Sequence, residues 1–512
     1  MTKQGAIYLV GTGPGETNLI TVKGMALVRE ADVIVGDALI HARLLQEARP
    51  EIEIHDIGSR TKGNKVPQEE VSQLLVDLAQ QGKTVVRLWP GDPFVFGRAT
   101  REMIAARRAG VRVELVPGVT SAIAVPAYAG VPVTDWDYAT SFAVVSGYES
   151  KTQTVRANWA ALAGVETLVI LMPLEHLPEI VGKLLTAGRS ADTPVLIVQQ
   201  GTLPQQQQVQ TTLSTVVETV KNYQIQPQAT MVVGSVVELT SELAWFQPGD
   251  EYPLLGKRVL VTRPAHQTED FMVALRSLGA EPISFPTIEI RPMADTRLLD
   301  EAIRQIGESA SQRSNQSTKY DWLVLTSANG VAAFWDSLKR VGFDSRCLAP
   351  VRIAAIGPAT AAALAQRSIT PDLIPEVYTA EGVLEAFDQL GSVAGQLFLL
   401  ARADIARKTL AEGLVTRGAR VDEIPAYRTV PVQNGSLPPA ADIITFTSSS
   451  TVQGYVNCLG GRAPSDVLRD SWVVCIGPIT AATAKALEVP VNAVAETYTI
   501  EGMLETLKEV YL

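Results

Sequence analysis

The chain has few of the residues that build metal sites and disulfide frameworks. Its 512 residues include only three cysteines, Cys347, Cys458 and Cys475, and four histidines, all far apart in the sequence. A small, odd number of scattered cysteines fits neither a disulfide framework nor a cysteine-based zinc motif, and it suits a reducing compartment. We therefore expect a cytoplasmic protein without a metal centre.

Positive charge is also in short supply. Lysine and arginine number 44 against 54 aspartate and glutamate residues, which gives a formal net charge of -10. Binding nucleic acid requires a basic face, so this balance argues against a general nucleic-acid binder. An anionic small molecule can still bind where arginines or lysines gather locally.

Long apolar runs are missing as well. The longest, such as residues 167–172, have the length of a β-strand, whereas about 18 apolar residues are needed to cross a bilayer. Residues 1–5 do not begin a basic and then apolar leader, so we expect neither a signal peptide nor a membrane partner. The chain does have 46% hydrophobic against 19% charged residues, which is enough to build packed domains.

Short runs rich in Val, Ile and Leu alternate with longer helical patterns. Residues 6–10 are typical of a strand, 19–30 of a helix and 33–35 of the next strand. This alternation predicts an α/β fold with mostly parallel sheets and covering helices. In such folds ligands bind at the carboxyl ends of the strands.

A change in composition divides the chain near its middle. Residues 246–256 (FQPGDEYPLLG) are rich in proline, glycine and charge, and a new strand begins at Arg258. We therefore predict two modules joined by this segment.

The second module repeats itself. Its blocks recur in one order with offsets of 120, 120 and 121 residues: 356–361 (IGPATA) at 476–481 (IGPITA), 378–385 (YTAEGVLE) at 498–505 (YTIEGMLE) and 325–327 (LTS) at 446–448 (FTS). This period is too long for a solenoid, whose repeats span about 20–50 residues. The repeat predicts two similar α/β lobes with a cleft between them.

Three predicted strand ends of the first module carry residues suited to a ligand. Glycines in Gly11-Thr-Gly-Pro-Gly15 allow backbone N–H groups to approach a ligand. Asp92 lies in a Pro-Gly-Asp-Pro turn, where it can accept hydrogen bonds from ligand hydroxyls or amines. Thr120 and Ser121 either contact a ligand or cap the next helix. A dinucleotide site fits poorly, because Glu16 stands where a GxGxxG motif needs glycine.

These segments resemble uroporphyrinogen-III C-methyltransferases of the tetrapyrrole methylase family, which bind S-adenosylmethionine (SAM) between two α/β lobes. The resemblance runs from about Gly5 to Phe246. It rests on Val10–Gly15 (VGTGPG), Ala31–Asp37 (ADVIVGD), Val66–Glu70 (VPQEE), Gly91–Arg98 (GDPFVFGR) and Pro117–Ala124 (PGVTSAIA).

The resemblance implies roles for individual residues. In this chemistry a pyrrole carbon attacks the sulfonium methyl, and a ring proton must later leave, for which Asp37 stands at the position of the family's candidate general base. Read alone, Asp37 is equally typical of an exposed helix start. We assign Arg98 to substrate binding. The SAM contacts would be Pro14, Pro90, Gly91, Asp92, Val95, Thr120, Ser121, Met172 and Gly201.

Several positions depart from the family pattern. The family usually has cations or histidine where this chain has Ala38, Ser59, Trp89, Asp135-Trp136 and Tyr148. Uroporphyrinogen is a polycarboxylate, and each lost charge-assisted hydrogen bond costs about 1.5–3 kcal/mol. An alternative is therefore a module that binds SAM but is impaired, regulatory or specific for another tetrapyrrole.

Hydroxyl residues stand at predicted helix starts of the second module. Thr360 and Thr480 lie in the repeated IGPxTA blocks, and Ser327 and Ser448 end the repeated Thr-Ser pairs. At a helix start, a hydroxyl and free N–H groups can hold a carboxylate. The plainer interpretation of each residue is an ordinary N-cap.

This module resembles uroporphyrinogen-III synthases from about Gly256 to Leu512. The matching segments are 258–263 (RVLVTR), 326–329 (TSAN), 424–429 (IPAYRT), 445–448 (TFTS) and 476–481 (IGPITA). Members of that family cyclise linear hydroxymethylbilane with inversion of the last ring. Their fold is discontinuous, because the chain leaves lobe one, builds lobe two and returns.

The cyclisation needs no cofactor. The terminal hydroxyl departs as water, and the resulting azafulvene cation closes through a spiro intermediate, so the enzyme must fold the chain and assist the leaving group. The family counterpart of Tyr427 is the best candidate acid, and we assign Arg263 to carboxylate binding. Read alone, they are a strand tyrosine and a surface arginine.

Together the resemblances imply a bifunctional enzyme of sirohaem or cobalamin synthesis. The second module would make uroporphyrinogen III, and the first would methylate it to precorrin-2 with SAM. We expect small-molecule tetrapyrrole substrates and a homodimer formed through the methylase module.

The expected fold is α/β throughout, with a two-lobed tetrapyrrole methylase fold followed by a two-lobed, internally duplicated synthase fold. The expected boundaries are methylase lobes at 1–115 and 116–246, a linker at 247–256, synthase lobe 1 at 257–290 and 430–512, and synthase lobe 2 at 291–429.

Overall fold

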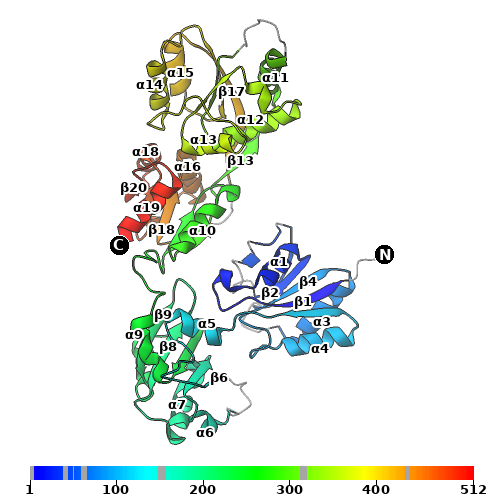
Figure 1. Ribbon diagram of the computed structural model, residues 1–512, viewed down its shortest axis with the longest axis vertical. Helices are drawn as coiled ribbons and strands as arrows, with labels where there is room; N and C mark the ends of the chain where they lie inside the picture. The colour runs from blue at the N-terminus through cyan, green and yellow to red at the C-terminus, as the bar shows by residue number, and fades with distance from the viewer. Residues whose placement is uncertain are drawn as a thin grey trace. The chain divides into compact units, whose positions relative to one another are not determined.

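The chain forms two compact units, Met1–Pro248 and Gly249–Leu512, which divide within the segment 247–256 (Figure 1). The structure is a computed structural model. It describes residues 5–37, 44–45, 47–49, 51–58, 66–147, 157–311, 320–432 and 437–511. Within these residues each unit contains two five-stranded sheets.

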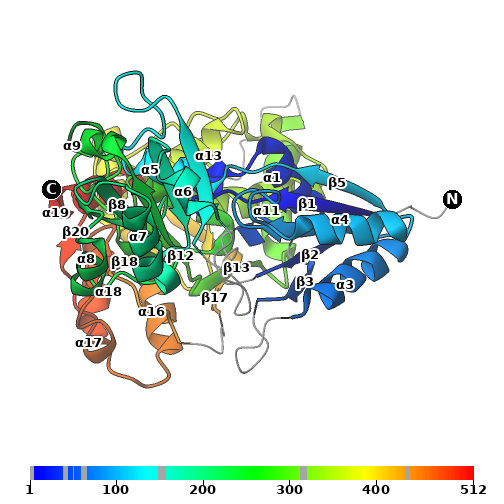
Figure 2. The same ribbon diagram turned by 90° about the horizontal axis from the view of Figure 1, so that it is seen from below.

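The first sheet of the first unit is parallel, with the strand order β3-β2-β4-β1-β5. Its central strands are buried on both faces because helices cover both sides, α1 on one face and α3 and α4 on the other (Figures 1 and 2). The elements are β1 (Ala6–Gly11), β2 (Val33–Gly36), β3 (Glu53–Asp56), β4 (Thr84–Trp89), β5 (Arg112–Val116), α1 (Val22–Glu30), α3 (Gln68–Gln80) and α4 (Ala99–Arg108).

The second sheet of this unit is mixed, with the order β6-β7-β10-β8-β9. Only β6 and β7 pair in parallel; the other pairs are antiparallel, unlike the mostly parallel arrangement expected. Strands β8 and β9 are joined by a short turn, which permits only antiparallel pairing. The elements are β6 (Phe142–Ser146), β7 (Thr167–Leu171), β8 (Pro194–Gln199), β9 (Gln207–Thr212), β10 (Ala229–Val233), α5 (Ser121–Tyr128), α6 (Trp159–Leu162), α7 (Leu177–Thr186), α8 (Val216–Asn222) and α9 (Thr240–Leu243).

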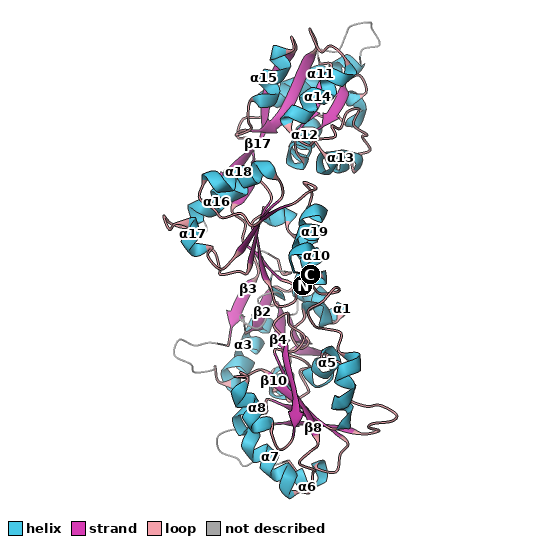
Figure 3. Cartoon of the chain, turned by 90° about the vertical axis from the view of Figure 1, so that its left-hand side faces the viewer, coloured by secondary structure: helices cyan, strands magenta, loops and turns pink. Residues whose placement is uncertain are grey.

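The first sheet of the second unit combines distant parts of the chain. Its parallel order β12-β11-β18-β19-β20 joins residues 258–284 to residues 443–494. Helices α16 and α18 cover one face, and α10 and α19 cover the other (Figure 3). The elements are β11 (Arg258–Val261), β12 (Glu281–Ser284), β18 (Ile443–Phe446), β19 (Trp472–Cys475), β20 (Ala493–Val494), α10 (Glu269–Ser277), α16 (Ser449–Cys458), α17 (Pro464–Val467), α18 (Pro478–Ala486) and α19 (Ile500–Tyr511).

The last sheet holds the chain between those two parts, in the order β13-β17-β16-β14-β15. Its strands pair in parallel except β13, which is antiparallel to the end of β17. The expected boundaries at 290/291 and 429/430 fall inside these two strands. The elements are β13 (Ile288–Pro292), β14 (Trp322–Leu325), β15 (Arg352–Ala355), β16 (Leu397–Ala403), β17 (Arg420–Pro431), α11 (Arg297–Ser311), α12 (Ala328–Arg340), α13 (Pro358–Ala365), α14 (Ala380–Leu390) and α15 (Thr409–Thr416).

The registers relate the two sheets of the second unit strand by strand. Trp322 pairs with Phe398 on one side and Arg352 on the other, and Ile443 pairs with Val259 and Trp472 in the same way. Strands β14 and β15 therefore correspond to β18 and β19, as the repeat of about 120 residues predicts. The registers add a second correspondence, of β11 and β12 with β16 and β17, offset by 139 residues.

Candidate functional site

Three neighbouring strand ends of the first sheet meet at backbone distance. Gly13 and Gly91 form an isolated bridge, in which Gly91 N donates to Gly13 O at 2.7 Å. A side chain at Gly11 would lie 2.6 Å from Gly118 N and 2.7 Å from Gly91 O. The ends of β1, β4 and β5 therefore require glycine because their backbones touch.

Asp92 ties two of these ends together. Its Oδ1 accepts from Phe94 N at 2.8 Å, within its own turn, and its Oδ2 accepts from Gly118 N at 3.0 Å after β5. An ionised carboxylate has about four lone-pair sites, so both oxygens keep the capacity to accept from a ligand. Val95, in the same loop, is exposed.

The start of α5 lies against this turn. Gly91 approaches Thr120 and Ser121, and Thr120 Oγ1 accepts from Ala122 N at 3.3 Å as the N-cap. Thr120 thus has the capping role that was the plainer interpretation of its sequence position. Ser121 is the first helical residue.

The remaining predicted cofactor residues come from the second sheet and the glycine loop. The first turn of α5 packs on the end of β7, and Met172 follows that strand, half exposed, with φ at 53°. Glu16 N, two residues after Pro14, donates to Thr202 Oγ1 at 3.2 Å, next to buried Gly201. The structure therefore places Pro14 and Gly201 in contacting loops.

Asp37 lies at the end of β2, beside the end of β3. Its carboxyl group packs directly on Gly58, where any side chain would displace it. Gly58 N donates to Asp56 Oδ1 at 2.8 Å, so two carboxylates flank this glycine. Arg98 is exposed before α4. Ala38, Ser59 and Tyr148 lie outside the described residues.

Sequence reasoning missed a buried ionic network beneath this edge. Arg87 Nε donates to Glu102 Oε1 at 3.1 Å, and Trp89 Nε1 donates to Glu102 Oε2 at 3.0 Å. Gln68 Nε2 also donates to Oε1 at 2.9 Å, and the Arg87 guanidinium lies 4.3 Å from the centre of the Trp89 ring. Burial lowers the pKa of Arg87, while Glu102 and Asp37 act in the opposite direction. The signal was an arginine inside the strand sequence Thr84-Val-Val-Arg-Leu-Trp89.

In the second unit, the two predicted serines are N-caps. Ser327 Oγ accepts from Gly330 N at 3.0 Å before α12, and Ser448 Oγ accepts from Thr451 N at 3.2 Å before α16. Thr360 and Thr480 lie instead within the first turns of α13 and α18, and both are buried. Gly357 and Gly477 hold the N-cap positions there.

Tyr427 contacts one of these caps. Its hydroxyl lies 2.9 Å from Ser327 Oγ, and the residue is only 7% exposed. Burial raises the pKa of Tyr427, the Ser327 hydrogen bond lowers it, and the charge of Asp404 raises it. The phenol therefore stays protonated at neutral pH.

Arg263 follows β11, next to the strand that ends before Ser448. Burial lowers its pKa, against the charges of Asp270 and Glu501. Its Nε is buried and has no hydrogen-bond partner among the described residues. A buried donor without a partner is costly, which suits a group that receives a ligand carboxylate.

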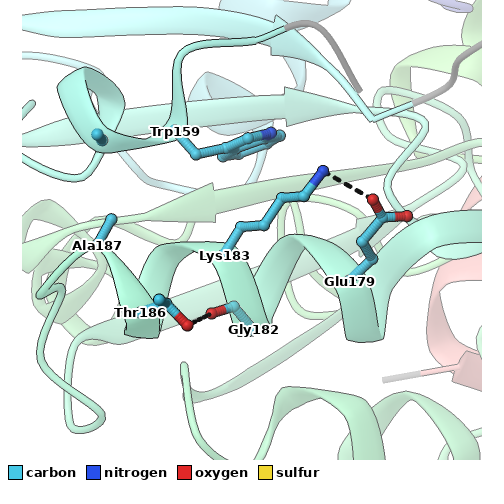
Figure 4. Close-up of a pocket in the computed structure, with 7 residues that line it drawn as sticks. Trp159, Glu179, Gly182, Lys183, Thr186 and Ala187 are labelled. Atoms are coloured by element: carbon cyan, nitrogen blue, oxygen red, sulfur yellow. Dashed lines mark hydrogen bonds and ion pairs between the residues drawn. The ribbon is translucent and has the colours of Figure 1, made fainter. Parts of the chain in front are cut away.

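A surface hollow of about 470 Å³ lies elsewhere, between α6 and α7 (Figure 4). Trp159 and Lys183 line it, and Lys183 Nζ pairs with Glu179 Oε1 at 2.7 Å. None of the predicted site residues lines this hollow.

Comparison with known proteins assigns both units. The family model of Tetrapyrrole (Corrin/Porphyrin) Methylases matches residues 6–217, and that of Uroporphyrinogen-III synthase HemD matches residues 269–505. The Porphyrin biosynthesis protein HemD of Ruminiclostridium josui is 33% identical, over 99% of this chain and 98% of its own length. The Uroporphyrinogen-III C-methyltransferase of Methanocaldococcus jannaschii is 42% identical, over 46% of this chain and 98% of its own.

A solved structure is also similar. Uroporphyrin-III C-methyl transferase from Thermus thermophilus, complexed with S-adenyl homocysteine, is 36% identical and covers 46% of this chain and 100% of its own, with a TM-score of 0.40.

The chain belongs to the tetrapyrrole methylases in its first unit and to the uroporphyrinogen-III synthases in its second. It is a fusion of a SAM-dependent uroporphyrinogen-III C-methyltransferase with a uroporphyrinogen-III synthase. The predicted family, fold class, pair of enzyme activities and cofactor are thereby confirmed. Among the described residues, no helix combines the length and apolar composition needed to cross a membrane.

We predict that Glu102→Leu destabilises the first unit. Buried Arg87 would lose its counter-charge, which costs about 3–5 kcal/mol. Replacing Arg87 and Glu102 together with leucine should recover most of that loss, because no buried charge remains. Calorimetric unfolding of the full chain measures the stability of the single and the double variant. The control is Arg101→Leu, which removes an exposed ion pair to Glu69. A Glu102→Leu effect no larger than the control contradicts the prediction.

Proposed function

We propose that the two units catalyse consecutive steps. The second unit cyclises hydroxymethylbilane to uroporphyrinogen III, and the first methylates that product to precorrin-2, for sirohaem or cobalamin synthesis. The observation that carries the proposal is the pairing of both families in one chain, where the product of one is the substrate of the other.

SAM would bind at the strand ends of the first unit and supply the methyl group. The site residues suit it chemically, because Asp92 retains acceptor capacity for ribose hydroxyls while Val95 and Met172 offer exposed apolar surface. The full set of proposed contacts is Pro14, Pro90, Gly91, Asp92, Val95, Thr120, Ser121, Met172 and Gly201.

Asp37 would take the ring proton that methylation releases. Its carboxyl group is fixed against Gly58 and interacts with the charge of Arg87 on the neighbouring strand β4. Arg98, exposed at the start of α4, would bind a substrate carboxylate.

One observation favours the alternative of a module that binds SAM but methylates weakly or acts on another tetrapyrrole. Trp89 stands where the family usually has lysine, and its indole N–H is already donated to Glu102. It therefore offers a substrate carboxylate no donor.

In the second unit, Tyr427 would protonate the leaving hydroxyl. Burial keeps the phenol protonated, so its proton is available at neutral pH. Arg263, Ser327, Thr360, Ser448 and Thr480 are the proposed substrate-binding residues, at strand ends and first helical turns.

The location, oligomeric state and lobe boundaries of the protein are also proposals. We propose a cytoplasmic homodimer formed through the methylase unit. The proposed lobe boundaries at 115/116, 290/291 and 429/430 fall within strands β5, β13 and β17, so each lobe begins or ends in the strand concerned. Three free cysteines support the reducing location.

The proposed sequence of reactions predicts two products from one substrate. With hydroxymethylbilane alone, the full chain should form the type-III cyclic isomer; with SAM added, the product should gain two methyl groups. Mass and isomer analysis distinguishes them. Absence of the type-III isomer overturns the synthase assignment, and an unmethylated product with intact SAM binding selects the alternative.

Asp92→Asn should weaken binding of S-adenosylhomocysteine by about tenfold or more, the loss of one charge-assisted hydrogen bond. Titration calorimetry on the full chain measures it. Asp77→Asn, an exposed change on α3, is the matched control. Equal affinities for the two variants would remove Asp92 from the cofactor site.

Tyr427→Phe should slow formation of the type-III isomer by about tenfold or more, within the usual range for acid catalysis. Because burial raises the pKa of the phenol, the unmodified enzyme should keep its activity into alkaline pH and lose it only as the phenol ionises. A pH profile of the initial rate tests both points. An unchanged rate removes Tyr427 from the mechanism.

A further inference from the structure

Ser327 and Tyr427 share a hydrogen bond that helix capping does not require. Ser327 Oγ accepts from Gly330 N at 3.0 Å as the N-cap of α12, and it also lies 2.9 Å from Tyr427 OH. The phenol ring packs over the same turn, with Cε1 3.9 Å from the position a Gly330 Cβ would take. The serine thus links the start of α12 to a buried phenol.

The internal duplication supplies a comparison. Ser448 occupies the equivalent place in the other lobe and caps α16 through Thr451 N, but its Oγ contacts Ser450 Oγ at 2.9 Å. Counting back 139 residues from Tyr427, the second offset of the duplication, leads to Ile288. The lobe can therefore be built without the phenol, and the Ser–Tyr pair is a feature of one lobe alone.

We propose that Ser327 is a positioning residue for Tyr427, donating its hydroxyl hydrogen to the phenol oxygen so that the phenol hydrogen faces the substrate. The proposal rests on the proposed role of Tyr427 as the acid. A hydroxyl has one donor and two acceptor sites, so Ser327 can accept from Gly330 N and donate to Tyr427 at once. The backbone donor polarises the serine and strengthens its own donation.

The Ser327–Tyr427 hydrogen bond would act during proton transfer from Tyr427 to the substrate. Tyr427 O–H breaks as its proton joins the leaving hydroxyl, the substrate C–O bond breaks, and water departs with the bonding electron pair. The azafulvene cation and a Tyr427 phenolate remain. The Ser327 hydrogen bond stabilises that phenolate until the proton released after ring closure restores the phenol.

Other groups around Tyr427 do not offer this stabilisation. Asp404, in the loop after β16, carries a negative charge that disfavours the Tyr427 phenolate; it pairs with Arg428 at 3.5 Å and accepts from Thr429 N. The strand opposite places Pro292 against Tyr427. Among the described charged groups and hydroxyls, Ser327 is the one in direct contact with the phenol oxygen.

The test compares Ser327→Ala with Tyr427→Phe in the full chain, using initial rates of type-III isomer formation. Ser327→Ala should lower kcat by about tenfold, the loss of one hydrogen bond to a charged group, whereas loss of its proposed substrate contact would appear in KM. The alkaline limb of its pH profile should move to higher pH, because the bond that lowers the pKa of Tyr427 is gone. The double variant should be no slower than Tyr427→Phe alone.

Two further variants separate positioning from capping. Thr379→Ala removes an N-cap of the same kind, from Gly382 N at 3.1 Å before α14, and should leave kcat unchanged. Ser327→Asp keeps an N-cap acceptor but places a negative charge beside the phenol, so it should fold and be slower than Ser327→Ala. Ser327→Thr, which keeps the hydroxyl, should retain most of the rate.

The outcomes are distinguishable. A normal rate for Tyr427→Phe overturns the acid assignment and this inference with it. A slow Tyr427→Phe combined with a Ser327→Ala variant as fast as Thr379→Ala overturns this inference alone. Rate losses that multiply in the double variant also overturn it, because Ser327 would then act independently of Tyr427.

Discussion

Parallel strand pairing is the constraint on which both sites depend. Parallel neighbours end at the same edge of a sheet, so the turns that follow them, with the free N–H groups of the next helix, collect there. In the first unit this brings Gly11, Gly91 and Gly118 into backbone contact. In the second it brings the helix starts after β14 and β18 to the edges of their sheets. The candidate site residues thus lie on turns that parallel pairing already places at one edge of a sheet.

In the second unit, each sheet also combines strands from two different copies of a sequence repeat. Residues 258–288 correspond to 397–427, and residues 322–385 correspond to 443–505, so the chain reads as two copies of one unit in tandem. Each sheet takes its two halves from different copies, because β11 pairs with β18 and β16 with β14. This exchange makes the fold discontinuous. It also lets one lobe carry Tyr427 while its counterpart keeps Ile288.

The sequence predicted the repeated turns, which need particular residues, but it did not predict the repeated strands, which need only apolar residues. The 120-residue repeat was visible because its Gly-Pro and Thr-Ser blocks sit at strand-to-helix turns. The 139-residue repeat was not, because Arg258-Val-Leu-Val-Thr-Arg263 and Leu397-Phe-Leu-Leu-Ala-Arg402 are identical only at Leu260/Leu399 and Arg263/Arg402. Thr360 and Thr480 were expected at helix starts, but proline at the first helical position puts the N-cap on the preceding glycine.

The ionic network beneath the methylase site constrains how that unit can bind a polycarboxylate. A buried Arg87–Glu102 pair adds little stability compared with apolar packing, so its presence in an otherwise apolar layer calls for another reason. Glu102 accepts hydrogen bonds from Arg87 and Trp89, which precede the loop from Pro90 to Arg98. Glu102 itself lies in the first turn of α4, directly after that loop, so its hydrogen bonds connect the two ends of the loop. The network therefore fixes Asp92 from both sides of its loop. Trp89 thus uses its indole N–H within the network, and Arg98 is the exposed cation of this loop.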